Sequence, residues 1–389
     1  MKRVSNILFI ACAAVFLLLI AAVTILRPAE TFSYYENRSL AKKPVNDPAL
    51  VNDGTWYPAM EKFLCDSAAG RKTITKLCTA ADLSLKRPVV NDVVIGDGIL
   101  LPFNPYEAVD RAKLKRQAEA IGNNLKAVSD VTESVGGRYY YVSVPCQYSY
   151  CAEDYPDYLD DRAELTAASV EALTESLSAR GVGYIDTGPA FDAMGKDMTL
   201  SSTVDNHFSI FGAYEAYRIV LEAMNSDGCD VPVLGKDELT FTETENYYMG
   251  SRTRKLFNLV KNTEHLWRAD PVAPVEFTRT NNGNWGVPSV YHREEPWTPL
   301  LYTYYMGGDI GETVIETDRP AYPDILIYGD SFTNAMECIL YLSCDTMYSL
   351  DLRHYRGTVS DYILEHEPDY VICVRSYESL LSTTYNGGR

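Results

Sequence analysis

The pattern of apolar and polar positions begins with one long apolar segment. An uncharged run of twenty residues, Ile7 to Leu26, follows Lys2 and Arg3, and a helix of that length spans a bilayer core. A cleaved signal peptide usually has a shorter apolar core and a small-residue cleavage site, and neither is evident before Arg27. We therefore predict an uncleaved membrane anchor over residues 1–28. Basic residues at its start place the rest of the chain outside the cytoplasm.

Residues 29–85 are predicted to form an extended juxtamembrane leader followed by a helical segment. Apolar residues recur at helical spacing from Gly54 to Leu85, with a break near Gly70. A Gly-Asp-Gly turn between two short apolar runs then predicts a β-hairpin over residues 93–101.

Residues 86–389 alternate between strand and helix patterns, which predicts one α/β domain. Short apolar, β-branched runs alternate with segments of helical periodicity, and this order is typical of a mainly parallel sheet covered by helices on both faces. The predicted strands are residues 138–145, 182–186, 325–328, 346–349 and 370–374, and the predicted helices are 110–131, 165–177, 209–225 and 335–342. In such folds ligands bind at the carboxyl ends of the strands.

Between about residues 236 and 318 this periodicity is interrupted by an insertion rich in aromatic and turn residues. Aromatic side chains there can pack on their own sheet, or form a groove that binds sugar rings. We favour the packing interpretation and keep the groove as the alternative.

Composition excludes some classes of function. The chain is 46% hydrophobic and 23% charged, which is ordinary for a globular protein. Without Lys2 and Arg3 the formal net charge changes from −18 to −20, so a nucleic-acid partner is not expected. The cysteines form no CxxC pair or metal-ligand spacing; Cys146 and Cys151 are the nearest pair outside the anchor that could form a disulfide.

The stretch from Pro323 to Asn334 carries the strongest candidate for chemistry. An apolar strand ends in Gly329-Asp330-Ser331, and a helix-compatible segment follows at once. A serine at such a turn is exposed on the sheet edge beside a helix N-terminus, which suits a nucleophile. Capping of the following helix by Asp330 or Ser331 is the alternative, and on the tripeptide alone it is favoured.

A base for Ser331 is supplied by Asp205-Asn206-His207, just before a predicted helix. In an extended segment residues i and i+2 point to the same face, so Asp205 could orient His207, whose other ring nitrogen would face the serine. The remaining histidines (His265, His292, His354 and His366) lack such a setting. A lone Asp-x-His would be a turn and a helix entry, but the two motifs together predict a Ser-His-Asp triad.

The sequence resembles the DHHW-motif family, which is SGNH-hydrolase-like and similar to the extracytoplasmic alginate O-acetyltransferases. The matching segments are 35–41, 201–217, 250–251, 307–309, 326–332 and 351–355. The chain departs from the name-giving motif by reading Asp205-Asn206-His207-Phe208 in place of Asp-His-His-Trp.

This resemblance implies an SGNH-hydrolase-like (flavodoxin-like) three-layer sandwich. It implies a triad of Ser331, His207 and Asp205 that transfers acetyl groups to a polysaccharide. A multi-pass membrane acyltransferase would supply the acetyl group, and no cofactor or metal is expected. Asn334 and Arg375 are candidate oxyanion-hole or substrate residues beside the N–H of Ser331, and Phe208 retains apolar bulk at the position of the tryptophan. An acetyl-esterase on the same fold and a non-catalytic glycan-binding or assembly protein are the alternatives.

Overall fold

The computed structural model describes residues 2–36, 38–286 and 288–387. The chain divides into two compact units, which are described separately. The smaller unit contains residues 1–95 and 251–261, and the larger unit contains residues 96–250 and 262–389. The predicted domain limits at residues 28 and 85 stay predictions.

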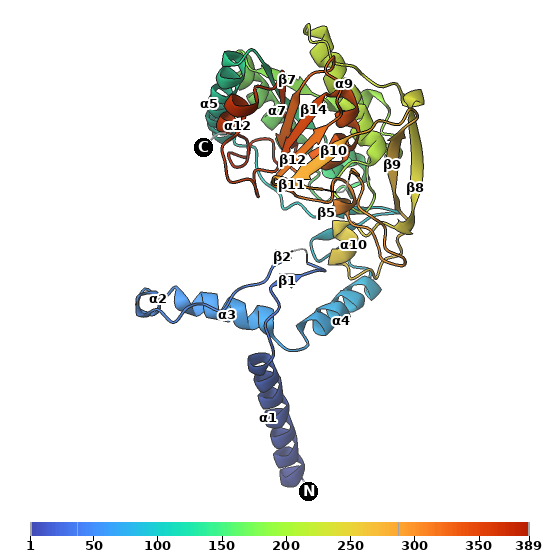
Figure 1. The fold of residues 1–389 in the computed structure, drawn as a ribbon. Helices are drawn as coiled ribbons and strands as arrows, with labels where there is room; N and C mark the ends of the chain where they lie inside the picture. Colours follow the sequence, from blue (N-terminus) through green and yellow to red (C-terminus); the bar gives the residue numbers. More distant parts are fainter. Residues whose placement is uncertain (1, 37, 287, 388–389) are drawn as a thin grey trace. The chain divides into compact units, whose positions relative to one another are not determined.

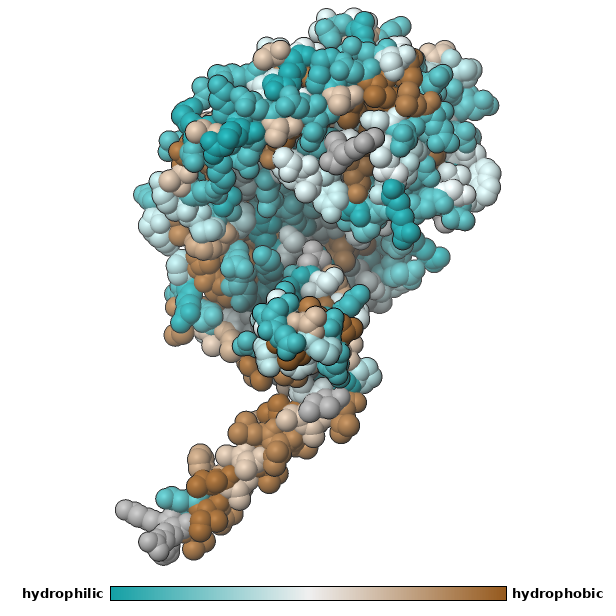
Figure 2. All heavy atoms as spheres, turned by 90° about the vertical axis from the view of Figure 1, so that its left-hand side faces the viewer, coloured by the Kyte–Doolittle hydropathy of each residue, from teal (hydrophilic) through white to brown (hydrophobic). Residues whose placement is uncertain are grey.

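The smaller unit begins with helix α1 (Lys2–Leu26). Its segment Val4–Thr24 has 21 residues and a mean hydropathy of 3.0, and none of it is buried. Figure 2 shows a mostly apolar surface along this helix. The predicted N-terminal apolar helix is thus confirmed, and by length and composition it can cross a membrane, as a signal sequence also could.

The rest of the smaller unit consists of short helices and strands. In chain order these are β1 (Phe32–Ser33), β2 (Arg38–Ser39), α2 (Pro48–Asn52), α3 (Trp56–Ser67), α4 (Arg71–Ser84), β3 (Val89–Val90), β4 (Val93–Ile95) and α10 (Ser251–Lys255). The predicted break near Gly70 is confirmed, because Gly70 adopts a φ of 77° between α3 and α4.

Ion pairs hold the predicted leader against the helices of this unit. The Arg38 guanidinium contacts both carboxylate oxygens of Asp66, at 2.6 and 2.9 Å, and Glu36 accepts from Arg71 at 2.7 Å. The Arg38 hydrogen bonds lower the pKa of Asp66 to about 2. These ion pairs show that the leader is folded rather than merely extended. Asn37, within the leader motif, lies outside the described residues.

The larger unit is built on one mixed sheet. Within the described residues its eight strands lie in the order β11-β10-β12-β14-β13-β15-β6-β7. The five strands from β14 to β7 are parallel, and β12, β10 and β11 extend the sheet in antiparallel fashion. Their bounds are β6 (Arg138–Val144), β7 (Gly183–Asp186), β10 (Thr278–Asn281), β11 (Asn284–Trp285), β12 (Glu312–Glu316), β13 (Ile325–Gly329), β14 (Thr346–Leu350) and β15 (Tyr370–Ser376). All five strands predicted for the parallel sheet are confirmed.

Helices cover this sheet. Figure 1 shows α5 (Arg111–Ser134) and α12 (Val359–His366) on one side of the sheet and α9 (Ile210–Ser226) on the other. The core on the first side joins side chains such as Leu125 and Leu173 to Tyr139, Leu326 and Val371 of the sheet. The helix α7 (Ala163–Ser178) contributes to the same core, whereas α11 (Thr333–Leu340) packs against α9. The predicted α/β class is confirmed.

The strand order differs from the flavodoxin-like expectation. With the parallel strands numbered along the chain, the order is 2-1-5-3-4, whereas flavodoxin-like sheets have the order 2-1-3-4-5. The last strand, β15, lies between β6 and β13 because it pairs with both. Its carboxyl end therefore lies beside the turn that carries Ser331.

The predicted insertion over about 236–318 extends the sheet and also forms a separate strand pair. Strands β8 (Leu239–Tyr247) and β9 (His265–Pro271) pair with each other, while β10 to β12 extend the main sheet. Most of its tyrosines are buried, as the packing interpretation predicts, but Trp285 and Trp297 are 80% and 96% exposed. The remaining elements of the larger unit are β5 (Leu100–Pro102), α6 (Gln147–Tyr150), α8 (Gly188–Ala193) and short 3-10 turns.

Within the described residues no disulfide joins the cysteines. Cys146 and Cys151 are both buried, and they do not form the disulfide that their proximity in sequence suggested. Burial raises the pKa of the Cys146 thiol to about 11, so this thiol is protonated at neutral pH.

Candidate active site

Ser331 lies in the tight turn between β13 and α11. Gly329 precedes it at the end of the strand, and an added Cβ there would overlap the carbonyl oxygen of Val374 on the neighbouring strand β15. Only glycine permits this close approach of the two backbones. The turn therefore projects Ser331 from the carboxyl edge of the parallel sheet, as the sequence predicted.

Asp330 fastens this turn to the end of β15. Its Oδ2 accepts from the N–H and the hydroxyl of Ser376, both at 2.9 Å, and from the hydroxyl of Ser379 at 2.6 Å. Its Oδ1 accepts from the N–H of Phe332 at 3.1 Å. Asp330 thus holds the turn before α11 but does not cap that helix, which begins after Phe332 without a side-chain cap, and the Ser331 hydroxyl has a different partner.

That partner is His207. The Nε2 atom of His207 lies 2.6 Å from Oγ of Ser331. On the other side of the ring, Nδ1 lies 3.5 Å from Oδ1 of Asp205. The side chains of His207 and Asp205 are only 10% and 5% exposed. The structure therefore places Ser331 next to the Asp205-x-His207 motif, although Ser331 and His207 are 124 positions apart in the sequence.

The loop that carries Asp205 and His207 is held by buried polar contacts. Ser201 and Phe208 form an antiparallel bridge at its base. The buried Gln147 donates from its side chain to the Ser202 carbonyl at 2.8 Å, and its backbone N–H donates to the Asn206 carbonyl at 3.1 Å. These hydrogen bonds hold the loop, and with it the side chain of His207, in a defined position although the loop is neither a helix nor a strand.

A carboxylate from the insertion also fixes this loop. Glu264 accepts from the N–H and the hydroxyl of Thr203, at 2.8 and 2.6 Å. Burial raises the pKa of Glu264, and the Thr203 hydrogen bonds oppose that rise.

Two tyrosines complete the surroundings of the base. The hydroxyl of Tyr248 donates to Oδ2 of Asp205, and burial raises the pKa of Tyr248 well above its usual value, so it remains a donor. The ring of Tyr302 stacks on the His207 imidazole, with centroids 3.7 Å apart and an interplanar angle of 6°. The ring of Phe332 also contacts this imidazole, and the two ring centroids lie 4.9 Å apart. Sequence reasoning missed both tyrosines, because an aromatic-rich insertion offers no signal that distinguishes them from their neighbours.

The other predicted site residues lie in different settings. Asn334 is in the first turn of α11, and its Nδ2 lies 3.5 Å from Asp309. The Arg375 guanidinium donates to the carbonyls of Tyr385 and Thr384, at 2.9 and 3.4 Å, so its hydrogen bonds go to the C-terminal segment. Phe208 is buried and packs edge-on against Phe332 at 5.0 Å.

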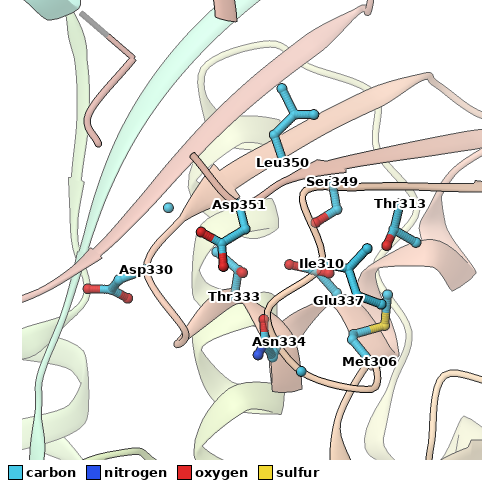
Figure 3. A pocket seen from close by; sticks show the side chains of 12 residues that line it. Met306, Ile310, Thr313, Asp330, Thr333, Asn334, Glu337, Ser349, Leu350 and Asp351 are labelled. Atoms are coloured by element: carbon cyan, nitrogen blue, oxygen red, sulfur yellow. The ribbon is translucent and has the colours of Figure 1, made fainter. Parts of the chain in front are cut away.

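A backbone N–H and a small cavity lie beside the Ser331 turn. Within the described residues the N–H of Ser331 donates to no protein acceptor. The cavity, of about 10 Å³, is close to the space needed for one water molecule. Figure 3 shows Thr333, Asn334 and Glu337 around it, with the Asp330 carboxylate turned away. Burial raises the pKa of Glu337.

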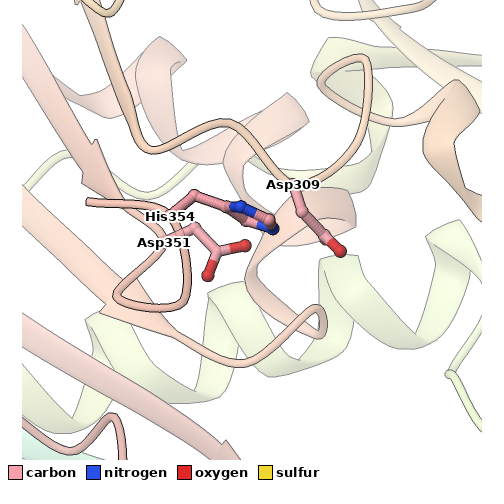
Figure 4. Close-up of side chains that lie close together, drawn as sticks. All are labelled: Asp309, Asp351 and His354. Carbon is pink, nitrogen blue, oxygen red and sulfur yellow. The ribbon is translucent and has the colours of Figure 1, made fainter. Parts of the chain in front are cut away.

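A cluster of potential metal ligands lies next to this cavity and shares Asp351 with its lining. Asp309, Asp351 and His354 place their ligand atoms within 4.8 Å of one another (Figure 4). Arg353, however, contacts both carboxylates, at 2.9 and 2.7 Å. The carboxylates are thus already paired with a cation from the chain itself.

No family model and no curated protein matches this chain. PatB1 of Bacillus cereus, solved with a sulfonyl adduct, has a TM-score of 0.64 and 19% identity, covering 76% of this chain and 98% of its own. A DHHW family protein from Eubacterium siraeum has a TM-score of 0.57 and 19% identity, covering 77% of this chain and 95% of its own. The chain shares its fold with these two proteins.

The resemblance to the DHHW-motif family, inferred from the sequence, is thereby confirmed at the level of fold. The O-acetyltransferase domain of Pseudomonas putida AlgJ is a more distant neighbour, with a TM-score of 0.45 and 15% identity, covering 75% of this chain and 92% of its own. At such distances a shared fold does not establish a shared reaction, which has to be argued from the residues of this chain.

Proposed function

We propose that this chain is an extracytoplasmic O-acetyltransferase that acts on a cell-surface or secreted polysaccharide. Ser331 is its nucleophile, His207 its general base and acid, and Asp205 the residue that orients the imidazole. The observation that carries the proposal is the 2.6 Å contact between Ser331 Oγ and His207 Nε2, with the Asp205 carboxylate at the other ring nitrogen.

The first half of the reaction forms an acetyl-serine. Oγ of Ser331 attacks the acetyl carbonyl carbon while Nε2 of His207 takes the hydroxyl proton. The resulting oxyanion accepts a hydrogen bond from the N–H of Ser331. When the intermediate collapses, the bond to the donor oxygen breaks, and that oxygen receives the proton from Nε2.

The second half transfers the acetyl group. A sugar hydroxyl gives its proton to Nε2 and attacks the acetyl carbon, and the bond to Ser331 Oγ then breaks as the proton returns to Oγ. The imidazolium formed in each half strengthens the attraction between His207 Nδ1 and Asp205, so the 3.5 Å contact is expected to shorten during reaction. Asn334, one helical turn after Ser331, is the candidate for the second oxyanion donor.

The donor and the location follow from the same proposal. Acetyl-coenzyme A is cytosolic, so the resemblance implies that a multi-pass membrane acyltransferase passes the acetyl group outward. Helix α1 would remain uncleaved and hold the two proteins in one membrane. The side chains of Thr24 and Arg27 support retention, because they bind the backbone of residues 67–69.

An acetyl-esterase is the second candidate. Ser331 is partly exposed, so water can reach the acetyl-serine and compete with a sugar hydroxyl. Release of acetate at an equal rate with and without an added oligosaccharide acceptor would favour the esterase. A non-catalytic glycan-binding protein would show neither reaction.

Covalent labelling tests the nucleophile. PatB1 was solved with a sulfonyl adduct, so an aryl sulfonyl fluoride is a suitable probe. We expect stoichiometric labelling of the wild-type chain, none of Ser331→Ala, and much slower labelling of His207→Ala. Ser343→Ala, which changes another buried serine, should label normally. Absence of wild-type labelling would contradict the proposed nucleophile.

The acetyl content of the host's glycans tests the transferase. Cells that carry only the Ser331→Ala copy should have less O-acetyl ester on a wall or secreted glycan than cells with the wild-type copy. Equal acetyl content, with both proteins present in equal amount, would contradict the transferase.

A further inference from the structure

We infer that the smaller unit contains a binding pocket for an anionic membrane phospholipid, next to the outer end of α1. This inference rests on the proposal that α1 is a retained membrane span. The pocket has a volume of about 560 Å³, within the range of natural ligand pockets. Some of the residues in each of three segments, 24–31, 40–43 and 60–64, line the pocket.

The position of the pocket relative to a bilayer follows from the length of the span. Val4–Thr24 has 21 residues, which as a helix is about 31 Å long and matches a hydrocarbon core of about 30 Å. Thr24 and Arg27, which line the pocket, therefore lie where the hydrocarbon meets the headgroups. A lipid at that level can enter the pocket without leaving the bilayer.

The attachment of α3 to the end of α1 keeps the pocket at that level. The Thr24 hydroxyl accepts from the N–H of Ala69 at 2.9 Å, and the Arg27 guanidinium donates to the carbonyls of Ser67 and Ala68, at 3.1 and 3.4 Å. Because these contacts join the end of α3 to the end of the span, the α3 side of the pocket cannot move far from the membrane surface.

The pocket lining has three basic residues, Arg27, Lys42 and Lys43, against one carboxylate, Glu30, and this excess of positive charge suits a phospholipid with a net negative charge. Met60, Phe63 and Leu64 of α3 supply an apolar wall for the upper part of an acyl chain, and Leu64 remains 45% exposed. Lys42 and Lys43 are exposed on the same pocket, and within the described residues neither has an ion-pair partner. Unpaired lysines at the headgroup level attract anionic lipid phosphates.

The division of charge along the chain agrees with this site. Without Lys2 and Arg3, which precede the span, the smaller unit has 14 Lys and Arg residues against 8 Asp and Glu, a formal charge of +6, while the larger unit has 19 against 45, or −26; together these give the −20 of the chain without those two residues. An anionic bilayer surface attracts the first unit and repels the second. Positive charge is thus concentrated in the unit that contains the span.

Photolabelling of the full-length protein in nanodiscs tests the site. The discs contain equal amounts of phosphatidylglycerol and phosphatidylcholine, and in each experiment one of the two carries a diazirine near the headgroup end of its acyl chain. Mass spectrometry should find label on residues 57–67, at least fivefold more from phosphatidylglycerol than from phosphatidylcholine. Each lysine near an anionic surface contributes a factor of about five.

Lys42→Gln/Lys43→Gln should reduce the phosphatidylglycerol labelling at least fivefold, to the phosphatidylcholine level. The matched control Lys76→Gln/Lys86→Gln removes two exposed lysines of the same unit outside the pocket, and should keep the preference. Equal labelling by the two lipids in the wild type, no label on residues 57–67, or a photocrosslink from position 64 to another membrane protein in native membranes would each overturn the lipid site.

The sulfonyl fluoride reaction separates this inference from the proposed catalysis. If Ser331 fails to react while phosphatidylglycerol still labels residues 57–67, the catalysis is wrong and the lipid site stands. If Ser331 reacts and the lipid preference is absent, the lipid site is wrong and the catalysis stands. Recovery of the mature protein without residues 1–26 would remove the span on which the lipid site depends, without affecting the test of Ser331.

Discussion

Replacement of Tyr248 by phenylalanine isolates one hydrogen bond to the proposed triad. The Tyr248 hydroxyl donates to Oδ2 of Asp205, while Oδ1 accepts from the N–H of Asn206 at 2.7 Å and faces the His207 ring. Tyr248 is only 1% exposed and lies behind Asp205, so the substitution removes the hydroxyl without changing a surface that can bind substrate. We regard Tyr248 as a positioning residue that fixes the carboxylate.

The magnitude follows from the charge and burial of Asp205. A hydrogen bond to a charged group contributes about 1.5–3 kcal/mol. The Asp205 side chain is 5% exposed, so water cannot easily replace the lost donor. Because Asn206 still holds the other oxygen, we expect the lower part of that range, about 1.5–2 kcal/mol. If this is lost in the transition state, kcat/KM falls about 10- to 30-fold.

Hydrolysis of an activated acetyl ester gives the measurement, with kcat and KM determined separately. The decrease should be in kcat, with KM unchanged. Tyr141→Phe is the matched control, because Tyr141 is also fully buried and donates to a carbonyl, that of Leu380, in the core on the α5 side of the sheet. That variant should lose stability but keep kcat/KM.

A double-mutant cycle sharpens the test. In an Asp205→Asn background, Tyr248→Phe should cost much less than in the wild type, because the carboxylate that it positions is gone. Equal costs in the two backgrounds, or a kcat/KM of Tyr248→Phe within twofold of the wild type, would refute the positioning role.

Three further predictions concern the turn that carries Ser331 and the helix after it. Asp330→Ala leaves the donors of Ser376 and Ser379 without their acceptor, and should lower the free energy of unfolding by about 2–4 kcal/mol, measured in urea; an unchanged value would contradict the fastening of the turn to β15. Gly329→Ala should cost about 3 kcal/mol or prevent folding, because its Cβ overlaps a backbone carbonyl, whereas Gly286→Ala has more room and should cost less. Burial raises the pKa of Glu337 in the folded state, so the folded state holds this proton more tightly, and stability should fall as pH rises from the unfolded pKa through the folded one. Glu337→Gln should flatten that slope as the pH rises above the usual pKa of a glutamate, about 4.5; identical slopes would show that Glu337 does not titrate as its burial requires.

Local patterns in the sequence were sufficient for most elements of the larger unit. The five parallel strands and the helices α5, α7, α9 and α11 follow from runs of β-branched residues and from helical spacing, which are properties of neighbouring residues. The strand order was not predictable in the same way. It depends on β15 pairing with both β6 and β13, and a strand's neighbours are not encoded in its own periodicity.

The candidate site was predicted where two local signals complement each other. Gly329-Asp330-Ser331 and Asp205-x-His207 each predict a turn, and together they supplied a candidate nucleophile and a candidate base, whose reacting atoms the structure places 2.6 Å apart. Tyr248 and Tyr302 reach the same place only through the folding of the insertion, so no spacing in the sequence reports them.

The direction in which Arg375 points was not predictable from its place at a strand end. Along β15, Val371 and Cys373 face the core beneath α5, and Arg375 follows at the same parity, so its guanidinium extends on that side and binds the C-terminal segment. Ser376, one residue further, points the other way and reaches Asp330.

The departure from the DHHW motif is explained by what each position does in this chain. Asn206 acts through its backbone, since its N–H donates to Asp205 and its carbonyl accepts from the N–H of Gln147. These contacts do not require histidine at that position. Phe208 supplies a ring that packs edge-on against Phe332, which in turn contacts the imidazole of His207. The phenylalanine is buried and supplies this ring contact in place of the indole of tryptophan. The arrangement therefore depends on the aspartate and histidine of the motif through their side chains, and on the other two positions through backbone and shape.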